Sequence, residues 1–238
     1  LSRALMSFEN ISIERTGAVA TLWLDRPEKL NALHRVLWKS IPAAVASLDA
    51  DPDVKVIVLA GRGKAFCAGI DLIDHAPSMA AGGSLSGRSE SVVGKRRALL
   101  DDIRGYQQTA SCFANTNKPV VAAVHGACIG AGMDLITACD IRLASADAVF
   151  SVRETRIAMV ADIGTLQRLP RVIGDGPARE LIFTGRDIDA ARAFSIGLLN
   201  EVLPDAAALH AQAQLLAQEI AANSPLAVQG SKQVLSHA

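Results

Sequence analysis

The stretch "PVVAAVHGACIGAGMDL", residues 119–135, joins an apolar run to two glycines and one isolated carboxylate, Asp134. The run Pro119 to Gly126 is typical of a buried β-strand. Gly130 and Gly132 indicate a turn, and we expect a helix to begin near Gly132. Such a turn directs unpaired N–H groups and the positive end of the helix dipole toward one point. That point is suited to stabilising a developing oxyanion.

Two nucleotide-binding motifs fail at single positions. A dinucleotide fingerprint on these glycines would need a third glycine at position 135, which is Leu135. A phosphate loop at Gly63-Lys64 would need glycine and a hydroxyl residue where the chain has Val58 and Ala65. The strand, turn and helix therefore remain as a candidate oxyanion site.

Strand-like and helical runs alternate along the rest of the chain. Further strands are predicted at Ala18–Asp25, Val54–Ala60, Asp140–Ser145 and Ala148–Val152. Apolar residues at helical spacing predict helices at 35–50, 94–114 and 205–223. The segment Ala76 to Gly94 is rich in serine and glycine, which predicts a surface loop. The alternation indicates an α/β architecture.

Composition narrows the class of protein. The 238 residues are half hydrophobic, and 24 basic residues balance 24 acidic ones, so neither nucleic acid nor an anionic membrane is an expected partner. No apolar run approaches the ~20 residues of a membrane span. The first ten residues lack the apolar segment of a signal peptide, so we expect a cytoplasmic protein.

Neither the cysteines nor the histidines form a recognisable ligand pattern. The four cysteines have no CxxC spacing and lie in or beside apolar sequence, which predicts reduced thiols rather than a catalytic cysteine. The five histidines do not pair with one another or with cysteine at ligand spacing. We therefore expect no metal.

A second glycine turn, in "GRGKAFCAGIDL" (Gly61 to Leu72), also follows a predicted strand. Gly69 allows a close backbone approach, so the N–H of Ile70 is a candidate second donor beside that of Ala131. Two such N–H groups would form an oxyanion hole. Two ordinary strand-to-helix turns would have the same sequence features, and spacing alone does not decide between these interpretations.

Four blocks together resemble the crotonase, or enoyl-CoA hydratase/isomerase, superfamily: "DRPEKLNAL" (25–33), "GKAFCAGIDL" (63–72), "HGACIGAGMDLITACDIRLAS" (125–145) and "GTLQRLPRVIG" (164–174). The resemblance implies an α/β crotonase-type spiral of ββα units, here residues 1–185, with a helical C-terminal region, residues 186–238, that trimerises and is truncated relative to the family. It also implies a homo-oligomer, a trimer or a dimer of trimers. The substrate would be an acyl-CoA thioester, with coenzyme A as part of the substrate and no separate cofactor.

The resemblance also implies roles for individual residues. The thioester oxygen would be held by the N–H groups of Ile70 and Ala131. Coenzyme A would be bound by Ala68, Gly69, Asp71 and Leu72, with Glu28, Lys29 and Leu30 near its adenosine part. Two departures from the family pattern matter. Ala131 replaces the usual glycine and requires a negative φ, and Ile73 stands where many hydratases have a lysine near the phosphates.

The acids distinguish among the family's reactions. Hydratases hold a water between two glutamates whose positions match Asp134 and Glu154, twenty residues apart, and a third acid, Asp162, follows eight residues later. This triple resembles that of the Δ3,5-Δ2,4-dienoyl-CoA isomerases. Moving the diene requires a proton to leave C2 and another to arrive at C6, which two carboxyl groups can serve. By resemblance Asp162 is the base, Glu154 is the acid, and Asp134 orients or tunes them.

Several alternatives stay open. Asp134 has a structural interpretation as a helix N-terminal acid, Glu154 as a partner of Arg153 or Arg156, and Asp162 as a helix cap. Alternative functions are an enoyl-CoA hydratase and a non-catalytic crotonase-fold protein that binds RNA or a protein.

Three residues near these motifs are given structural roles only. Asp140 and Arg142 are interpreted as a structural pair, His125 as a buried histidine and Tyr106 as packing.

Overall fold

The computed structural model describes residues 8–75 and 91–237 and contains two sheets. The larger sheet has the order β1-β2-β3-β4-β6-β9 and consists of Ile11–Thr16, Val19–Leu24, Val56–Gly61, Val120–Val124, Ile141–Ser145 and Glu201–Leu203. β1 and β2 are antiparallel and the other pairs are parallel. The smaller sheet has the order β5-β7-β8 and consists of Ala127–Ile129, Val149–Ser151 and Ile188–Asp189.

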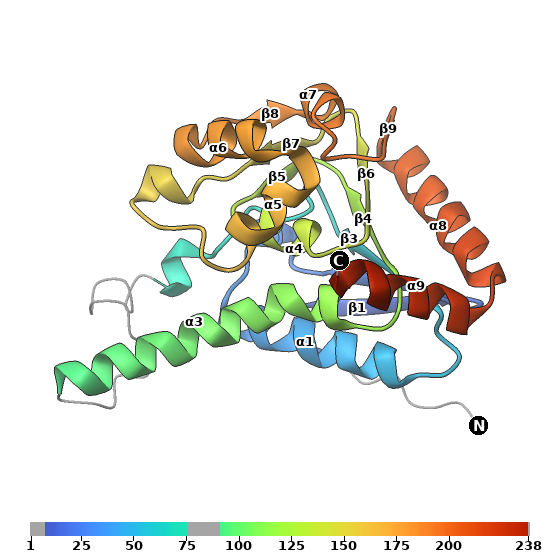
Figure 1. Ribbon diagram of the computed structural model, residues 1–238, viewed down its shortest axis with the longest axis horizontal. Helices are drawn as coiled ribbons and strands as arrows, with labels where there is room; N and C mark the ends of the chain where they lie inside the picture. Colours follow the sequence, from blue (N-terminus) through green and yellow to red (C-terminus); the bar gives the residue numbers. More distant parts are fainter. Residues whose placement is uncertain (1–7, 76–90, 238) are drawn as a thin grey trace.

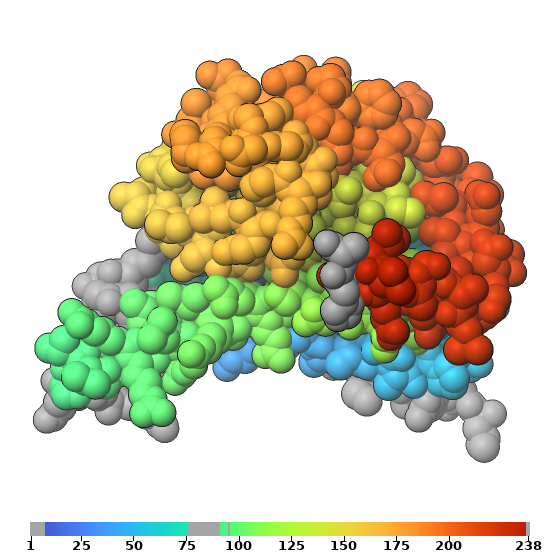
Figure 2. All heavy atoms as spheres, viewed as in Figure 1, coloured from blue at the N-terminus to red at the C-terminus, as the bar shows by residue number. Residues whose placement is uncertain are grey.

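The helices surround these sheets (Figure 1). The α-helices are α1 (Arg35–Ala50), α3 (Val92–Asn115), α4 (Ala131–Thr137), α5 (Thr165–Ile173), α6 (Asp175–Thr184), α7 (Ala190–Ser195), α8 (Ala206–Ala222) and α9 (Pro225–His237). Two short 3₁₀ helices, η1 (Pro27–Lys29) and η2 (Glu154–Ile157), interrupt the connections. The N-terminal part of α3 projects beyond the main body (Figure 2).

The central strands are buried on both faces, which is why their sequences read as continuous apolar runs. One face of the larger sheet, with Val58 and Val121 on it, packs against Leu209 and Ala213 of α8. The alternate residues of the same strands face the main core with α1, α3 and α4. This double coverage fixes the register of the strands that lead into the glycine turns.

The chain repeats one construction as it winds. β4 lies in the larger sheet, β5 in the smaller one, and α4 follows; β6, β7 and η2 then repeat the order of strand, strand and helix. The last part of the described chain, residues 201–237, consists of β9 followed by α8 and α9. The predicted ββα spiral and its helical C-terminal region are therefore confirmed. The domain boundary at residue 185 stays a prediction, and β8 and β9 beyond it join the two sheets.

The predicted elements match the structure to differing extents. The five predicted strands correspond to β2, β3, β4, β6 and β7, and the helix predicted at 35–50 is α1 with the same bounds. The helix expected near Gly132 begins at Ala131. The loop predicted at 76–94 is shortened by α3, which begins at Val92 after its cap Ser91. Its other part, 76–90, lies outside the described residues.

Asp140 and Arg142 do not form the structural pair that the sequence predicted. The Asp140 carboxylate accepts from the Val120 N–H at 2.7 Å and from the Lys232 ammonium at 2.8 Å. Arg142 donates to the carbonyls of Cys139 and Leu198. Both residues have structural roles, but each has a different partner. Lys232 attaches α9 to the core through this carboxylate.

Among the described helices, none combines the length and apolar character needed to cross a bilayer.

Candidate active site

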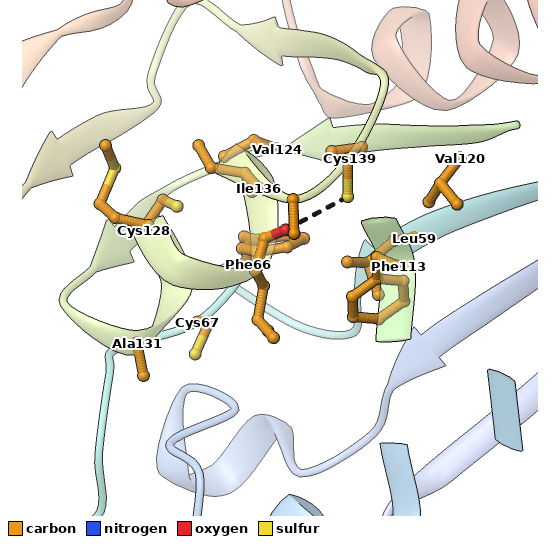
Figure 3. Packing of buried hydrophobic residues seen from close by; sticks show 14 of the residues in the cluster. Leu59, Phe66, Cys67, Phe113, Val120, Val124, Cys128, Ala131, Ile136 and Cys139 are labelled. Carbon is orange, nitrogen blue, oxygen red and sulfur yellow. Dashed lines mark hydrogen bonds between the residues drawn. The ribbon is translucent and has the colours of Figure 1, made fainter. Parts of the chain in front are cut away.

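A single backbone bridge brings the two glycine turns together. The N–H of Cys67 donates to Ala127 O, and the N–H of Ile129 donates to Cys67 O, both at 2.9 Å. Cys67 and Cys128 are thereby paired in parallel, with Ala131 close by (Figure 3). Because parallel segments run in the same direction, the residues that follow Cys67 and Cys128 leave the bridge side by side.

Beyond this bridge, Gly69 passes close to the start of α4. A Cβ on Gly69 would lie 3.0 Å from Ile129 O and 3.8 Å from the backbone nitrogen of Ala131, and its φ is +97°. A side chain here would therefore be both crowded and strained. The segment is held from the other side by Leu33, whose N–H donates to Gly69 O at 2.7 Å.

The two candidate N–H donors are available for a ligand. Within residues 8–75 and 91–237, the N–H groups of Ile70 and Ala131 donate to no protein acceptor. The positive φ of this turn is at Gly130 (+52°), so Ala131 keeps a negative φ, as its side chain requires. Both N–H groups belong to residues that line one cavity.

This cavity, called the acid cavity below, has a volume of about 250 Å³. Its walls come from residues 68–70, Leu72, residues 129–131, Asp134 and, in the segment after β7, residues 153, 154, 156, 157 and 159–163. The three predicted acids, Asp134, Glu154 and Asp162, all line it together with Ile70 and Ala131. Most of the remaining wall is apolar, with Ile129, Met159 and Val160 among its residues. An extended hydrocarbon chain fits such surroundings, with the acids beside it.

Asp134 is buried, with 1% of its surface exposed, and is held asymmetrically. The N–H of Thr165 donates to its Oδ1 at 2.8 Å, and the Thr165 hydroxyl donates to the same atom at 2.7 Å. Its other oxygen, Oδ2, is buried with no partner among the described residues. Burial raises the pKa of Asp134 to about 7, the Thr165 hydrogen bonds oppose the rise, and the nearby Glu154 adds to it.

Glu154 is the first residue of η2 and lies over the first glycine turn. A Cβ on Gly130 would lie 3.3 Å from Glu154 Oε1, while Oε2 is buried without a partner among the described residues. Burial raises the pKa of Glu154, and the charge of Asp162 adds to the rise. Arg153 pairs with Asp187 at 2.5 Å rather than with Glu154. Glu154 therefore lies at the acid cavity, and Arg153 forms its ion pair with another carboxylate.

Asp162 is held through its backbone. Its N–H donates to Val160 O at 2.8 Å, and its carbonyl accepts from the Gln107 side chain at 2.8 Å. It does not cap α5, because the N-cap of that helix is Gly164 and the first N–H of α5 is bound by Asp134. The Asp162 side chain is only partly buried and borders a second cavity as well.

The residues expected near coenzyme A form two paired segments. The N–H of Ala68 donates to Leu30 O at 2.9 Å, and that of Asp71 donates to Leu33 O at 3.0 Å. Ala68, Gly69 and Leu72 line the acid cavity, whereas Glu28, Lys29 and Leu30 lie at the surface in and after η1. The Asp71 carboxylate forms an ion pair with the Arg26 guanidinium at 2.7 Å.

Sequence reasoning missed three residues around the acids. Thr165 binds Asp134, Gln107 binds the Asp162 backbone, and Arg168 donates to Ser111 at 2.9 Å while it lies against Gly164. The positive charge of Arg168 also opposes the rise in the pKa of Asp134. Thr165 is the first residue of α5 and directly follows its N-cap, Gly164. This position at a helix start was the sequence signal that could have identified Thr165.

His125, Tyr106 and the four cysteines do not line the acid cavity. His125 is buried, as expected, and lies 3.0 Å from Gly63 O through Nε2. Tyr106 packs on Trp38 with their ring centres 4.8 Å apart. All four cysteines are free, and burial raises the pKa of Cys67 to about 12, which disfavours a thiolate. Over the described ranges, no cluster of side chains has the composition of a metal site.

Comparison with known proteins agrees with this geometry. The sequence model of the enoyl-CoA hydratase/isomerase family matches residues 14–238. The chain is 42% identical over 234 residues to the peroxisomal Δ3,5-Δ2,4-dienoyl-CoA isomerase of Arabidopsis thaliana, covering 96% of this chain and 82% of that protein. It is 43% identical over 228 residues to the human mitochondrial Δ3,5-Δ2,4-dienoyl-CoA isomerase, covering 95% and 68%.

A solved structure also resembles this chain in fold and in sequence. The enoyl-CoA hydratase of Bacillus anthracis superposes with a TM-score of 0.83 at 34% identity, covering 96% of this chain and 83% of that one. The family model spans nearly the whole chain, and the relatives share both its sequence and its fold. The chain therefore belongs to the enoyl-CoA hydratase/isomerase family.

Proposed function

We propose that the protein is an acyl-CoA isomerase that converts a 3,5-dienoyl-CoA into a 2,4-dienoyl-CoA. The observation that carries the proposal is the meeting, in one largely apolar cavity, of three acids and two N–H groups that have no acceptor among the described residues. The names of the Arabidopsis and human relatives support the choice of reaction.

The two ends of the diene need different groups. The N–H groups of Ile70 and Ala131 hold the thioester oxygen, on which negative charge gathers when a proton leaves C2, and each donor is worth roughly 3 kcal/mol of barrier. Asp162 accepts the proton from C2. Glu154, whose raised pKa favours the protonated form, donates a proton at C6. Asp134 orients and tunes the pair.

The proposal extends to binding and assembly. Coenzyme A, carried by the substrate, lies along Ala68, Gly69, Asp71 and Leu72 and reaches toward residues 28–30, and no separate cofactor takes part. Exposed apolar side chains on α8 and α9, namely Leu215, Leu226 and Leu235, support a homo-oligomer, a trimer or a dimer of trimers. The free thiols support a cytoplasmic location.

A comparison of two substrates tests the reaction. Purified protein is given a 3,5-dienoyl-CoA and, separately, a 2-enoyl-CoA. Ultraviolet absorbance follows the new conjugation in the first case and the loss of the enoyl double bond by hydration in the second. We expect the dienoyl substrate to be converted with the higher kcat/KM. Hydration without any diene conjugation would refute the isomerase assignment.

A hydratase is the second candidate, and one observation favours it. Asp134 Oδ2 and Glu154 Oε2 are both buried and unpartnered in the described part of the chain, and both residues line the acid cavity. A hydratase needs two carboxyl groups placed to hold one water. Asp162→Asn separates the candidates, because it would leave crotonyl-CoA hydration nearly unchanged in a hydratase and abolish diene conjugation in the isomerase.

A further inference from the structure

The proposed isomerisation leaves the two acids in the wrong protonation states for another turnover. Asp162 ends with the proton taken from C2, and Glu154 ends ionised after giving its proton to C6. Before the next substrate reacts, Asp162 must lose one proton and Glu154 must gain one. The proton either passes directly from Asp162 to Glu154 or exchanges with solvent, and the surroundings of the two acids distinguish these routes.

Asp162 lies between two cavities. One is the acid cavity, and the other, called the arginine cavity here, has a volume of about 410 Å³ between α3 and α5. Its walls include Gln107 and Ser111 from α3 and Gln167, Arg168 and Arg171 from α5. In Figure 1, α5 lies above the C-terminal half of α3. Asp162 belongs to both walls, whereas Glu154 belongs only to the wall of the acid cavity.

The two cavities differ in their walls. The arginine cavity is lined mostly by polar and charged side chains, and Gln167 and Arg171 are exposed at the surface, so water can enter it. The acid cavity is mostly apolar, and Glu154 Oε2 is buried there. When an acyl chain fills the acid cavity, Asp162 still borders the polar arginine cavity on its other side.

We infer that the arginine cavity is the route by which Asp162 releases its proton to solvent. The inference rests on the proposed function. In each turnover the C2–H bond breaks, its proton passes to the Asp162 carboxylate, and that proton then leaves to water in the arginine cavity. Glu154 gives its proton to C6 and takes another from solvent through the acid cavity after the product has left. One proton is released and one is taken up, so the cycle is balanced.

Deuterium labelling tests the route. A 3,5-dienoyl-CoA with deuterium at both C2 positions is converted in ordinary water, and the product is analysed by mass spectrometry and NMR. We expect the product to keep one deuterium at C2 and to carry only protium added at C6. A product that carries the second deuterium at C6 in most turnovers would show direct transfer and would overturn the inference.

A matched pair of variants tests the cavity itself. Gln167→Trp places a bulky ring in the wall of the arginine cavity, and Gln108→Trp makes the same change at an exposed position of α3 outside both cavities. We expect Gln167→Trp to lower kcat several-fold at unchanged KM and to raise the fraction of deuterium at C6. We expect Gln108→Trp to behave as the native protein.

The outcomes separate the two levels of the proposal. Equal kcat and equal labelling in the two tryptophan variants would overturn the proton route while leaving the isomerase assignment standing. Absence of diene conjugation in the native protein would refute the proposed function, and the inference with it.

Discussion

Oδ1 of Asp134 accepts both the backbone N–H and the hydroxyl of Thr165, at 2.8 and 2.7 Å. Since Gly164, the N-cap of α5, has no side chain to accept a hydrogen bond, a residue of α4 caps α5 in its place. With both donors on Oδ1, the proton of a neutral Asp134 belongs on Oδ2. The acid cavity thus receives a carboxyl group in one fixed orientation.

Thr165→Val tests this orientation. The variant keeps the N–H donor and the shape of the side chain but loses the hydroxyl, so the pKa of Asp134 should rise further and its orientation should loosen. A loss of about 1–2 kcal/mol of transition-state stabilisation corresponds to roughly a tenfold fall in kcat. Diene conjugation measured across pH should show this fall and a shifted profile. Thr165→Ser should restore both, and failure of that rescue would contradict the role assigned to the hydroxyl.

Asp134→Asn should stabilise the protein at neutral and alkaline pH. The pKa of Asp134 is raised from 3.8 to about 7 in the folded protein, so between these values the folded state holds a proton that the unfolded state has released. The free energy of unfolding of the native protein therefore falls as pH rises through that window. The neutral amide does not titrate, and at ~1.4 kcal/mol per pKa unit its advantage reaches roughly 4 kcal/mol at most.

Urea unfolding of the native protein and Asp134→Asn at several pH values measures this advantage. It should be small near the lower end of the window, grow as pH rises, and level off above about pH 7. An advantage of the same size at about pH 5 and about pH 8 would show that the carboxyl group is not the source.

Glu154→Gln should abolish most of the activity and change its pH dependence. Because burial, aided by the charge of Asp162, raises the pKa of Glu154, the protonated acid persists to higher pH than usual, and kcat should fall as pH rises through that pKa. The amide cannot donate the proton, so we expect a loss of roughly 10²–10⁴ in kcat and no such falling limb. Glu9→Gln in the exposed turn before β1 is the control. Activity near the native level in Glu154→Gln would exclude Glu154 as the acid.

Gly69→Ala should damage the proposed oxyanion hole through the backbone. The added Cβ would lie 3.0 Å from Ile129 O at a φ of +97°, so the segment must shift and carry the N–H of Ile70 with it. Loss of one donor costs roughly 10²–10³ in kcat. Gly105→Ala is the matched control, because a Cβ there, within α3, meets nothing within 4 Å. It should keep full activity and gain ~0.5–1 kcal/mol in the free energy of unfolding. Equal activity in the two variants would refute the assignment of the Ile70 N–H.

Elements with their own periodicity were predictable from the sequence. The hydrophobic patterns of α1 and of the strands buried on both faces can be recognised without knowing which elements they contact. β5, β8 and β9 have three residues or fewer, and their pairing depends on the surrounding spiral. β1 was missed because half of its residues are exposed on an edge strand.

Side-chain partners far apart in the sequence were not predictable. Asp140 and Arg142 were paired because they are close in sequence, but the partner of Asp140 is Lys232, 92 positions away. Thr165 likewise lies 31 positions from Asp134. The acids themselves were found through their spacing within a known family, which predicts positions but not the hydrogen bonds that orient each carboxyl group.

The bridge between Cys67 and Cys128 is made of backbone groups alone. Because Cys67 and Cys128 are fully buried, the amide hydrogens of Cys67 and Ile129 should exchange with solvent more slowly than those of the partly exposed segment 153–163. Evolution can then replace the acids on that segment without disturbing the backbone that positions the two proposed oxyanion donors. One ancestral scaffold would in this way give rise to enzymes with different reactions on the same class of ester.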